Sequence, residues 1–238
     1  MSNKYSLFKF KKFSLQQVNA AMKIGTDGIL LGAWMNLNNK TKLLDIGTGT
    51  GVIALMQAQK SSSIKIDAIE IDAKACIDAK ANFINSPWEN RLTLYNCNLE
   101  NYSTPIKYDV IVSNPPFFEN SLKANSQERT LARHNSSLHY TDIFNFCVKN
   151  LNENGSLNLI LPKEQQEKCI LKAEKIGLAL IRKCNVFPNA TKQQHRTLFE
   201  FSFTKRKLKE ETITIELDKR HHYTNEYKEL TKDFYIIF

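Results

Sequence analysis

Short apolar runs of β-forming residues alternate with helical patterns over most of this 238-residue chain. We expect strands at 42–46, 64–70, 92–95, 108–112 and 156–161, and helices at 51–60, 73–84, 140–151 and 163–176. Such alternation is typical of parallel strands joined by crossover helices, because parallel neighbours cannot be connected by a tight turn. The sequence therefore predicts an α/β fold in which helices cover both faces of a sheet.

The pattern changes in the last quarter of the chain. Residues 178–187 and 197–205 are strand-like runs joined by a loop too short for a helix, which predicts an antiparallel pair at one sheet edge. A short strand is expected at 212–217, and the aromatic-rich segment 223–238 is expected to dock on the body. The fold prediction is a mostly parallel, Rossmann-like seven-stranded sheet with an antiparallel edge hairpin.

The composition is that of an ordinary globular protein, with 42% hydrophobic and 24% charged residues. No window approaches the apolar length of a membrane helix and the start lacks a signal sequence, so a cytoplasmic protein without a membrane partner is expected. We expect a monomer with one domain over 1–238, in which a core at 36–205 carries extensions at 1–35 and 206–238.

Neither the cysteines nor the histidines form a metal-binding pattern. The five cysteines are widely spaced without a C-x-x-C pair, which predicts reduced core fillers. The histidines share no ligand spacing with a cysteine or carboxylate cluster, so no metal is expected.

Positive charge is concentrated in two segments of the chain. The net charge is +9, of which residues 1–13 carry +4 and residues 182–207 carry +6, whereas residues 26–120 carry −2. A basic surface favours a polyanionic partner, although solvated charge runs are common on proteins that bind none. Any such surface is expected outside the central segment.

A glycine-rich turn follows the first predicted strand, where Gly47, Gly49 and Gly51 have the spacing G-x-G-x-G. Glycine suits a tight turn that a ligand approaches closely, and the following helix start offers free N–H groups. The dinucleotide fingerprint requires its third small residue one place later, where this chain has Val52. A pyrophosphate-binding turn is therefore disfavoured.

Two carboxylates follow the ends of neighbouring predicted strands. Asp45 could accept hydrogen bonds from a cationic amino-acid group or could fix the turn. Glu70 could accept both hydroxyls of a ribose, whereas a structural reading makes it a charge at a helix start. We favour Glu70 for the ribose and Asp72 for the helix cap. Together with the glycine turn, these carboxylates indicate a nucleoside ligand without a phosphate requirement.

The run Asn114-Pro-Pro-Phe117 stands at the carboxyl end of a buried strand, the edge where open α/β sheets bind ligands. The Asn114 side-chain carbonyl and the Pro115 backbone carbonyl could each accept one hydrogen of a planar amine, while Phe117 stacks on its ring. Accepting both hydrogens localises the nitrogen lone pair for attack. The alternative is a strand-ending turn with a core aromatic residue.

These motifs resemble those of the class I S-adenosylmethionine-dependent methyltransferases, in the N-P-P-F/Y form of members that methylate amino groups. The segments 22–34 and 223–235 are more particular and resemble a bacterial family that methylates the N6 amine of adenine 37 in a valine tRNA. The resemblance spans nearly the whole chain. It implies S-adenosylmethionine as cofactor and tRNA as partner.

The resemblance also implies roles for individual residues. Asp45 and the three turn glycines would hold the methionine part of the cofactor, Glu70 its ribose, and Asn114, Pro115, Pro116 and Phe117 the target adenine. Asn98 stands where such enzymes usually have an Asp for the cofactor adenine. Lys23, Thr26 and Asp27 would help to close the pocket, while the less favoured alternative makes Lys23 and Asp27 a surface ion pair.

The tRNA is expected to lie on the basic N-terminus and the 182–207 region. The residues expected to form this surface are Lys4, Lys9, Lys11, Lys12, Lys192, His195, Arg196, Lys205, Arg206 and Lys207. The aperiodic stretch 119–137, with Arg129, Arg133 and His134, is a candidate substrate loop.

Three other functions fit the same motifs. They are methylation of a protein glutamine amide, methylation of the N2 amine of rRNA guanine, and RNA binding without catalysis on the same fold. A nicotinamide-dependent dehydrogenase is disfavoured by the glycine spacing.

Overall fold

The computed structural model describes residues 7–117 and 138–238. Lys4 and the candidate substrate loop at 119–137, with Arg129, Arg133 and His134, lie outside the described residues. The strands are β1 (Leu7–Lys9), β2 (Ser14–Gln16), β3 (Lys42–Ile46), β4 (Lys65–Glu70), β5 (Leu92–Asn96), β6 (Tyr108–Ser113), β7 (Leu151–Pro162), β8 (Ala179–Asn189), β9 (Arg196–Ser202) and β10 (Lys209–Glu216). The helices are α1 (Thr26–Trp34), α2 (Val52–Lys60), α3 (Ala73–Ile84), α5 (Tyr140–Asn150), α6 (Gln166–Lys175) and α7 (Asn225–Thr231), with 3-10 turns η1 (Glu89–Arg91), η2 (Leu99–Asn101) and η3 (Lys163–Gln165).

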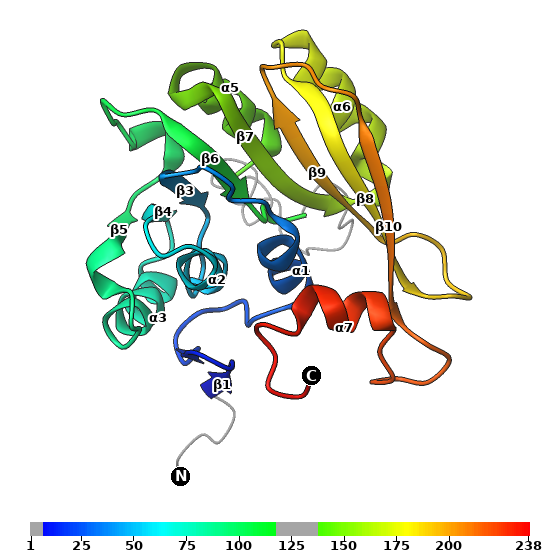
Figure 1. Cartoon of the computed structure of the whole chain (residues 1–238). Helices are drawn as coiled ribbons and strands as arrows, with labels where there is room; N and C mark the ends of the chain where they lie inside the picture. The colour runs from blue at the N-terminus through cyan, green and yellow to red at the C-terminus, as the bar shows by residue number, and fades with distance from the viewer. Residues whose placement is uncertain (1–6, 118–137) are drawn as a thin grey trace, which may run out of the picture.

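Most strands form one central sheet, and the predicted α/β architecture is confirmed (Figure 1). Within the described part of the chain this sheet has eight strands, in the order β10-β8-β9-β7-β6-β3-β4-β5. Every neighbouring pair is parallel except those that include β9, which runs against both β7 and β8. A separate antiparallel pair, β1–β2, was not predicted.

The predicted antiparallel hairpin exists as β8 and β9, but it does not form the sheet edge. β10 pairs in parallel with the outer side of β8, so the sheet has eight strands instead of the seven predicted. Ile213 of β10 is buried in the core, which explains why this strand joins the sheet. Burial of an apolar side chain favours docking, and docking on an open edge also satisfies backbone hydrogen bonds.

β7 is longer than the strand predicted at 156–161, because it begins at Leu151 and continues through Gly155. The register between β6 and β7 shifts here, so that Tyr108 pairs with Leu151 but Val110 pairs with Ser156. A Cβ on Gly155 would lie 2.8 Å from the Asn152 carbonyl oxygen. Glycine therefore permits an irregularity within the strand, a common use of glycine in sheets.

Each face of the sheet has its own hydrophobic core, because neighbouring strand residues point to opposite faces. Leu43 and Val110 belong to a core with α1 and α2, whereas Leu44 and Ile111 belong to a second core with α5 and α6. In Figure 1, α5 and α6 lie above the sheet, while α1 and α2 lie below it. The prediction of helices on both faces is confirmed.

The two terminal segments pack on each other beneath the first of these cores (Figure 1). The rings of Phe10 and Phe13 stack with centroids 4.4 Å apart, and Phe10 pairs with Tyr235 in a β-bridge. The Lys11 amide donates a 2.8 Å hydrogen bond to the Phe234 carbonyl. The aromatic C-terminal segment is therefore docked on the body, as predicted.

The cysteines are unpaired, as predicted, and all are buried except the half-buried Cys97. In the described ranges, no helix combines the length and apolar character that crossing a bilayer requires.

Candidate active site

The parallel strands β3, β4, β5 and β6 end at the same edge of the sheet, so the segments that follow them meet there. The Ser113 hydroxyl donates a 2.7 Å hydrogen bond to the Ile46 carbonyl, which ties the last residues of β6 and β3 together. The glycine turn and the Asn114-Pro-Pro-Phe117 motif therefore start from adjacent points.

The glycine turn adopts a backbone that other residues reach only with strain. Gly47, Gly49 and Gly51 have φ angles of 72°, 59° and 87°. Gly51 is the N-cap of α2, and a Cβ there would lie 2.5 Å from Cε1 of Phe83. Conformation and space thus both require glycine at this last position.

Asp45 lies beneath the turn with no exposed surface. One carboxylate oxygen, Oδ2, accepts hydrogen bonds from the Thr48 hydroxyl at 2.7 Å and the Ala54 amide at 3.2 Å. The other, Oδ1, is buried and has no hydrogen-bond partner among the described residues. Burial raises the pKa of Asp45 to about 7, against the lowering effect of these two hydrogen bonds. Asp45 fixes the turn and keeps one acceptor unused.

Glu70, the last residue of β4, holds the turn from the opposite side. Its Oε2 accepts a 2.8 Å hydrogen bond from the Gly49 amide, and Oε1 accepts a 2.9 Å bond from the Asp72 amide. Asp72 in turn caps α3 by accepting from the Lys74 amide at 2.9 Å, as predicted. Glu70 is 9% exposed and lines a cavity at this edge.

The Asn114 side chain also presents an unused acceptor at this edge. Its Oδ1 is buried and has no hydrogen-bond partner in the described part of the chain. Leaving a buried acceptor unpaired costs about 1–3 kcal/mol, so each such atom calls for a structural or functional explanation. Several buried oxygens are unpaired among the described residues, and two of them, on Asp45 and Asn114, stand near the ends of the paired strands β3 and β6.

A cavity of about 280 Å³ opens between these segments. Its polar lining includes Glu70, Asn98 and Asn114, and the turn contributes Gly47 and Gly49. The remaining lining residues are Met22, Ile46, Ile69, Ile71, Cys97, Leu99, Pro116 and Leu138. This is a mostly apolar pocket with a few convergent polar groups, the usual composition of a small-molecule site.

The cavity fits the cofactor implied by the resemblance. None of its described lining residues is Lys or Arg, and its one carboxylate belongs to Glu70. Such a lining suits a cationic nucleoside without phosphates, because it offers negative charge for a sulfonium and apolar walls for a purine. Asp45 carries an orphaned oxygen below the turn, but it is fully buried and does not itself line the cavity.

Not every predicted site residue lines this cavity. Asn98 does, and its Oδ1 also accepts from the Glu100 amide at 3.3 Å, so it caps η2 as well. The predicted residues that do not line it include Asp45, Gly51, Pro115, Phe117 and Thr26, of which Thr26 is exposed at the start of α1.

Lys23 and Asp27 do not form the surface pair considered above. The Lys23 ammonium donates to the backbone carbonyls of Gln17 at 2.6 Å and Ala20 at 3.0 Å. Asp27 instead forms a 2.8 Å ion pair with Arg196, and the guanidinium of Arg196 lies over the ring of Phe117. Neither Lys23 nor Asp27 lines the cavity.

Sequence reasoning missed the apolar walls of the cavity. Met22 and Ile71 line it although they are 67% and 51% exposed, and Leu138 lies beside Gly47. An isoleucine directly after the strand-ending Glu70 is a signal that could have found one wall. Met22 and Leu138 carry no such local signal, since they reach the site only through the tertiary fold.

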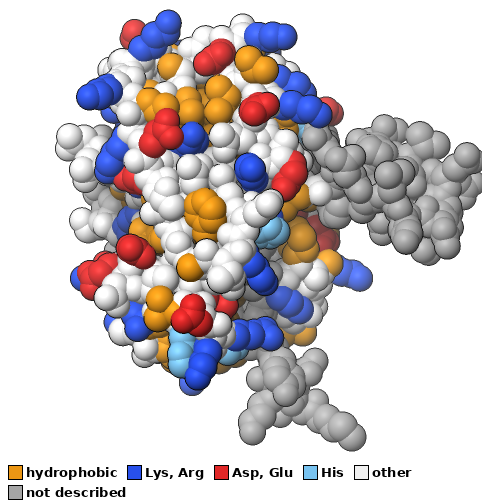
Figure 2. Space-filling view, turned by 90° about the vertical axis from the view of Figure 1, so that its right-hand side faces the viewer, with side chains coloured by type: hydrophobic (Ala, Val, Ile, Leu, Met, Phe, Trp, Pro, Cys, Tyr) orange, Lys and Arg blue, Asp and Glu red, His pale blue; other side chains and the backbone are white. Residues whose placement is uncertain are grey.

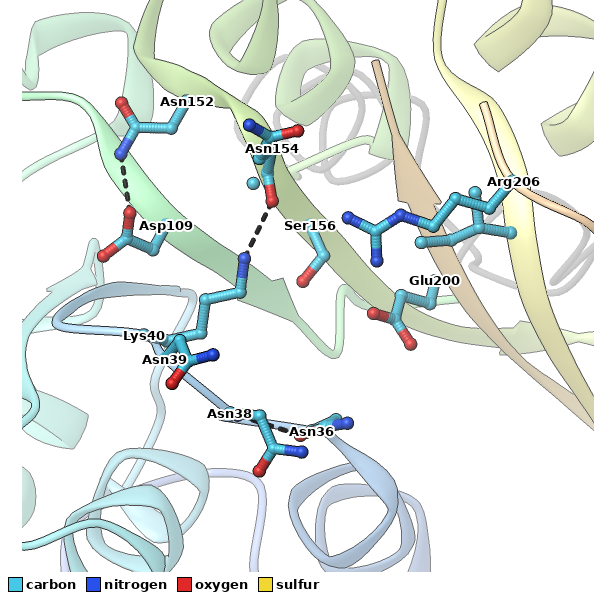
Figure 3. Close-up of a pocket in the computed structure, with 12 residues that line it drawn as sticks. Asn36, Asn38, Asn39, Lys40, Asp109, Asn152, Asn154, Ser156, Glu200 and Arg206 are labelled. Carbon is cyan, nitrogen blue, oxygen red and sulfur yellow. Dashed lines mark hydrogen bonds between the residues drawn. The ribbon is translucent and has the colours of Figure 1, made fainter. Parts of the chain in front are cut away.

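A second, more polar cavity of about 460 Å³ lies at the opposite edge of the sheet (Figure 3). The Lys40 ammonium donates to the Asn154 backbone carbonyl at 2.8 Å, and Asp109 accepts from the Asn152 side-chain NH2 group at 2.7 Å. These side chains are therefore used in holding β7 against the start of β3 and β6. No residue of the glycine turn or of the Asn114–Phe117 motif lines this cavity, so it is not the candidate site.

Comparisons with known proteins identify the family of this chain. The family model described as "Methyltransferase small domain" matches residues 13–187. Three relatives are named tRNA1(Val) (adenine(37)-N6)-methyltransferase. The Trichodesmium erythraeum protein is 46% identical, covering 96% of this chain and 97% of its own. The Parabacteroides distasonis protein is 44% identical, covering 99% of both, and the Flavobacterium psychrophilum protein is 43% identical, covering 97% of this chain and 99% of its own.

Solved structures share the fold at much lower identity. A structure described as a predicted O-methyltransferase from Agrobacterium tumefaciens superposes with a TM-score of 0.68 at 13% identity, covering 87% of this chain and 96% of its own. A glycopeptide N-methyltransferase complexed with S-adenosyl-L-methionine gives a TM-score of 0.52 at 10% identity, covering 78% of this chain and 98% of its own. The chain therefore belongs to the methyltransferase small domain family and, within it, to the group of bacterial proteins named tRNA1(Val) (adenine(37)-N6)-methyltransferase.

Proposed function

We propose that this protein transfers the methyl group of S-adenosylmethionine to the N6 amine of adenine 37 in tRNA1(Val). The observation that carries the proposal is the orphaned Oδ1 of Asn114, a buried acceptor that awaits a hydrogen-bond donor beside the cavity. The relatives' names support the choice of a tRNA adenine over a protein glutamine or an rRNA guanine.

The residues at this edge can perform the transfer without a strong base. When bound, S-adenosylmethionine supplies an electrophilic methyl group. Asn114 Oδ1 and the Pro115 carbonyl accept the two hydrogens of the adenine amine, which draws its lone pair out of the ring and toward the methyl carbon. Phe117 stacks on the base. The proton becomes acidic only after the new bond has formed, so positioning and electrostatics dominate the rate.

The test is a transfer assay with Asn114→Ala. We expect transfer to unmodified tRNA to fall by roughly 100-fold or more, a loss comparable to removal of one preorganised transition-state contact. Cofactor affinity, measured by calorimetry, should change little. Asn158→Ala is the matched control, because Asn158 is also buried with an unpaired Oδ1 but does not line the cavity. Retained turnover in Asn114→Ala, or equal loss in the control, contradicts the proposal.

We further propose that a basic surface at the carboxyl edge holds the tRNA. β8 and β10 end side by side, with Asn189 paired to Glu216, so the loops 190–195 and 217–222 leave the sheet together. They expose Lys192, Lys219 and Arg220, together with neighbouring histidines. In Figure 2, Lys, Arg and His side chains gather on the lower half of this side of the molecule. Exposed cations at the same edge of the sheet as the site suit RNA phosphates.

The basic residues of segment 182–207 are divided by the fold. Lys205, Arg206 and Lys207 follow β9, which runs opposite to its neighbours, so they lie at the other edge of the sheet. The length of β9 places them roughly 20 Å away from Lys192. Arg206 lines the second cavity there. We therefore leave these three residues out of the proposed tRNA surface.

Two triple charge reversals test this surface. Changing Lys192, Lys219 and Arg220 to Glu should weaken tRNA binding by roughly 10-fold or more and reduce its salt dependence, without affecting cofactor affinity. The same change at Lys205, Arg206 and Lys207 alters the net charge equally and should have a much smaller effect. Equal weakening by both sets would show that only total charge matters, and would refute the proposed surface. Lys9, Lys11 and Lys12, exposed near β1, form a third set for the same assay.

We propose that the chain acts as a single-domain monomer in the cytoplasm, where its tRNA substrate is found. Packing of β1–β2 against the C-terminal segment supports one folding unit over the extensions and the core. Sedimentation of the protein with and without an anticodon stem-loop RNA tests the monomer, and a stable dimer would refute it.

A further inference from the structure

Three residues that are far apart in the sequence meet beside the target-base motif. Asp27 lies in the first turn of α1, Phe117 closes the motif after β6, and Arg196 is the first residue of β9. The Arg196 Nε donates to Asp27 Oδ2 at 2.8 Å, and the guanidinium carbon lies 4.8 Å from the centroid of the Phe117 ring. Arg196 also donates to the backbone carbonyl of His195 at 3.1 Å.

These contacts hold the guanidinium in one place. The side chains of Arg196 and Asp27 are only 17% and 24% exposed, so their ion pair is partly shielded from water. An arginine fixed by a carboxylate and lying over an aromatic ring restricts that ring, because the planar guanidinium can pair and stack at the same time. Phe117 is half-buried and follows Pro116 of the cavity lining.

The charge of Arg196 is balanced at the same point. Methyl transfer moves positive charge onto the adenine amine, and an unpaired cation beside the base would oppose this change. Asp27 neutralises Arg196, so the pair can restrict Phe117 without adding net positive charge there. This arrangement differs from that of a phosphate-binding arginine, whose charge stays available for the ligand.

We propose that Arg196, held by Asp27, is a positioning residue that fixes the Phe117 ring for stacking on the target base. This inference rests on the proposed function and adds to it a role for two residues outside the Asn114–Phe117 motif. Arg196 acts through Phe117: it helps to orient the target base and does not attract the RNA.

The protein contains a matched control for the same geometry. Arg182 lies over the ring of Trp34 at 3.8 Å and pairs with Glu211 at 3.1 Å, which repeats the combination of arginine, ring and carboxylate. None of these three residues lines the candidate site. Substituting Arg182 therefore reports the cost of losing such a cluster as a purely structural element.

The experiment compares Arg196→Met, Asp27→Asn and Arg182→Met by steady-state kinetics on an anticodon stem-loop RNA. We expect Arg196→Met to lower kcat by about 10-fold, or about 1.4 kcal/mol of activation free energy, with KM for RNA changed less than about 3-fold. Asp27→Asn should also lower kcat, since it releases the cation and leaves it unbalanced. Arg182→Met should lower the melting temperature but leave kcat near that of the wild type.

A fluorescence measurement separates base positioning from a general loss of structure. With 2-aminopurine at position 37 of the RNA, stacking on Phe117 quenches the emission, and we expect less quenching in Arg196→Met at saturating protein. Arg196→Lys should restore little of it, because an ammonium cannot pair and stack simultaneously.

Two results would overturn the inference alone. One is a kcat for Arg196→Met equal to that of Arg182→Met, and the other is a raised KM with unchanged kcat, which would make Arg196 an RNA-binding residue. A wild-type protein that does not methylate the stem-loop or whole tRNA refutes the proposed function, and the inference with it. The wild-type measurement thus distinguishes the two failures.

Discussion

Replacing Asp45 by asparagine should stabilise the folded protein at neutral pH while weakening its cofactor binding. The buried carboxylate has a pKa raised from 3.8 to about 7 by loss of hydration. A shift of this size corresponds to about 4 kcal/mol, since each pKa unit is worth about 1.36 kcal/mol. This value is an upper limit for the cost of keeping the group ionised in the folded state at pH 8.

The direction in which the stability changes with pH follows from proton binding. Because the folded protein binds this proton more tightly than the unfolded chain, the contribution of Asp45 to stability is greatest below its unfolded pKa of 3.8. It is lost as the pH rises toward about 7, and above that the full cost applies. Asparagine does not titrate, so its advantage over Asp45 should be clearly smaller at pH 5 than at pH 8, where it is largest.

The amide can keep the contacts of the carboxylate. Its oxygen can accept from the Thr48 hydroxyl and the Ala54 amide as Oδ2 does, and its NH2 group replaces Oδ1, which has no partner among the residues described. For a chain of this size, 1 kcal/mol corresponds to about 2–4 °C in Tm, so the gain at pH 8 has an upper limit of about 8–16 °C. Loss of the charge should weaken S-adenosylmethionine binding by at least about 10-fold.

The assay is thermal unfolding of wild type and Asp45→Asn at pH 5, 6, 7 and 8, with cofactor affinity by calorimetry. Asp78→Asn is the control, because Asp78 is equally buried but accepts hydrogen bonds from the Asn19 and Ala20 amides and from the Asn19 side chain. It should lose about 1–3 kcal/mol at every pH, since an acceptor is replaced by a donor. An Asp45→Asn protein that is no more stable than wild type at pH 8, or whose gain is the same at every pH, refutes the reasoning.

Three further substitutions test the glycine turn. Gly51→Ala should lower the free energy of unfolding by about 1–3 kcal/mol, because a Cβ meets Phe83 at 2.5 Å and the φ of 87° strains any other residue. Urea titration measures this loss. Gly49→Ala should cost less, because a Cβ there meets nothing within 4 Å. Asn82→Ala should weaken both stability and cofactor binding, since Asn82 joins the Thr50 carbonyl of the turn to the backbone of Gln16; unchanged cofactor affinity would show that this link does not support the turn.

Most secondary structure could be predicted because it follows local patterns. The strand 42–46 and the helix 73–84 are observed with the predicted bounds, since the spacing of their apolar residues matches a strand and a helix respectively. The strand predicted at 156–161 was too short, because a glycine such as Gly155 can stand in a strand or in a turn and looks the same in sequence. Whether β10 adds to the sheet depends on an open edge beside β8, which no local pattern describes.

The site was predictable where its residues follow strand ends. The glycine turn, Glu70 and Asn114 meet because parallel strands end at one edge, which is a general property of open α/β sheets. Met22 and Leu138 could not be predicted in the same way, since their position depends on how the N-terminal segment and the start of α5 fold back over that edge.

The sequence by itself determined the α/β class, the two motifs and the kind of ligand they accommodate, because these depend on residue type and on spacing within short segments. Only the tertiary structure decided the partners of charged residues. It paired Asp27 with Arg196 instead of Lys23, and it separated Lys192 from Lys205 by the length of a strand. Ion pairs and surfaces form between residues that are neighbours in space. Because β9 runs antiparallel to β7 and β8, its first residue lies at the carboxyl edge of the sheet and the residues after it lie at the opposite edge.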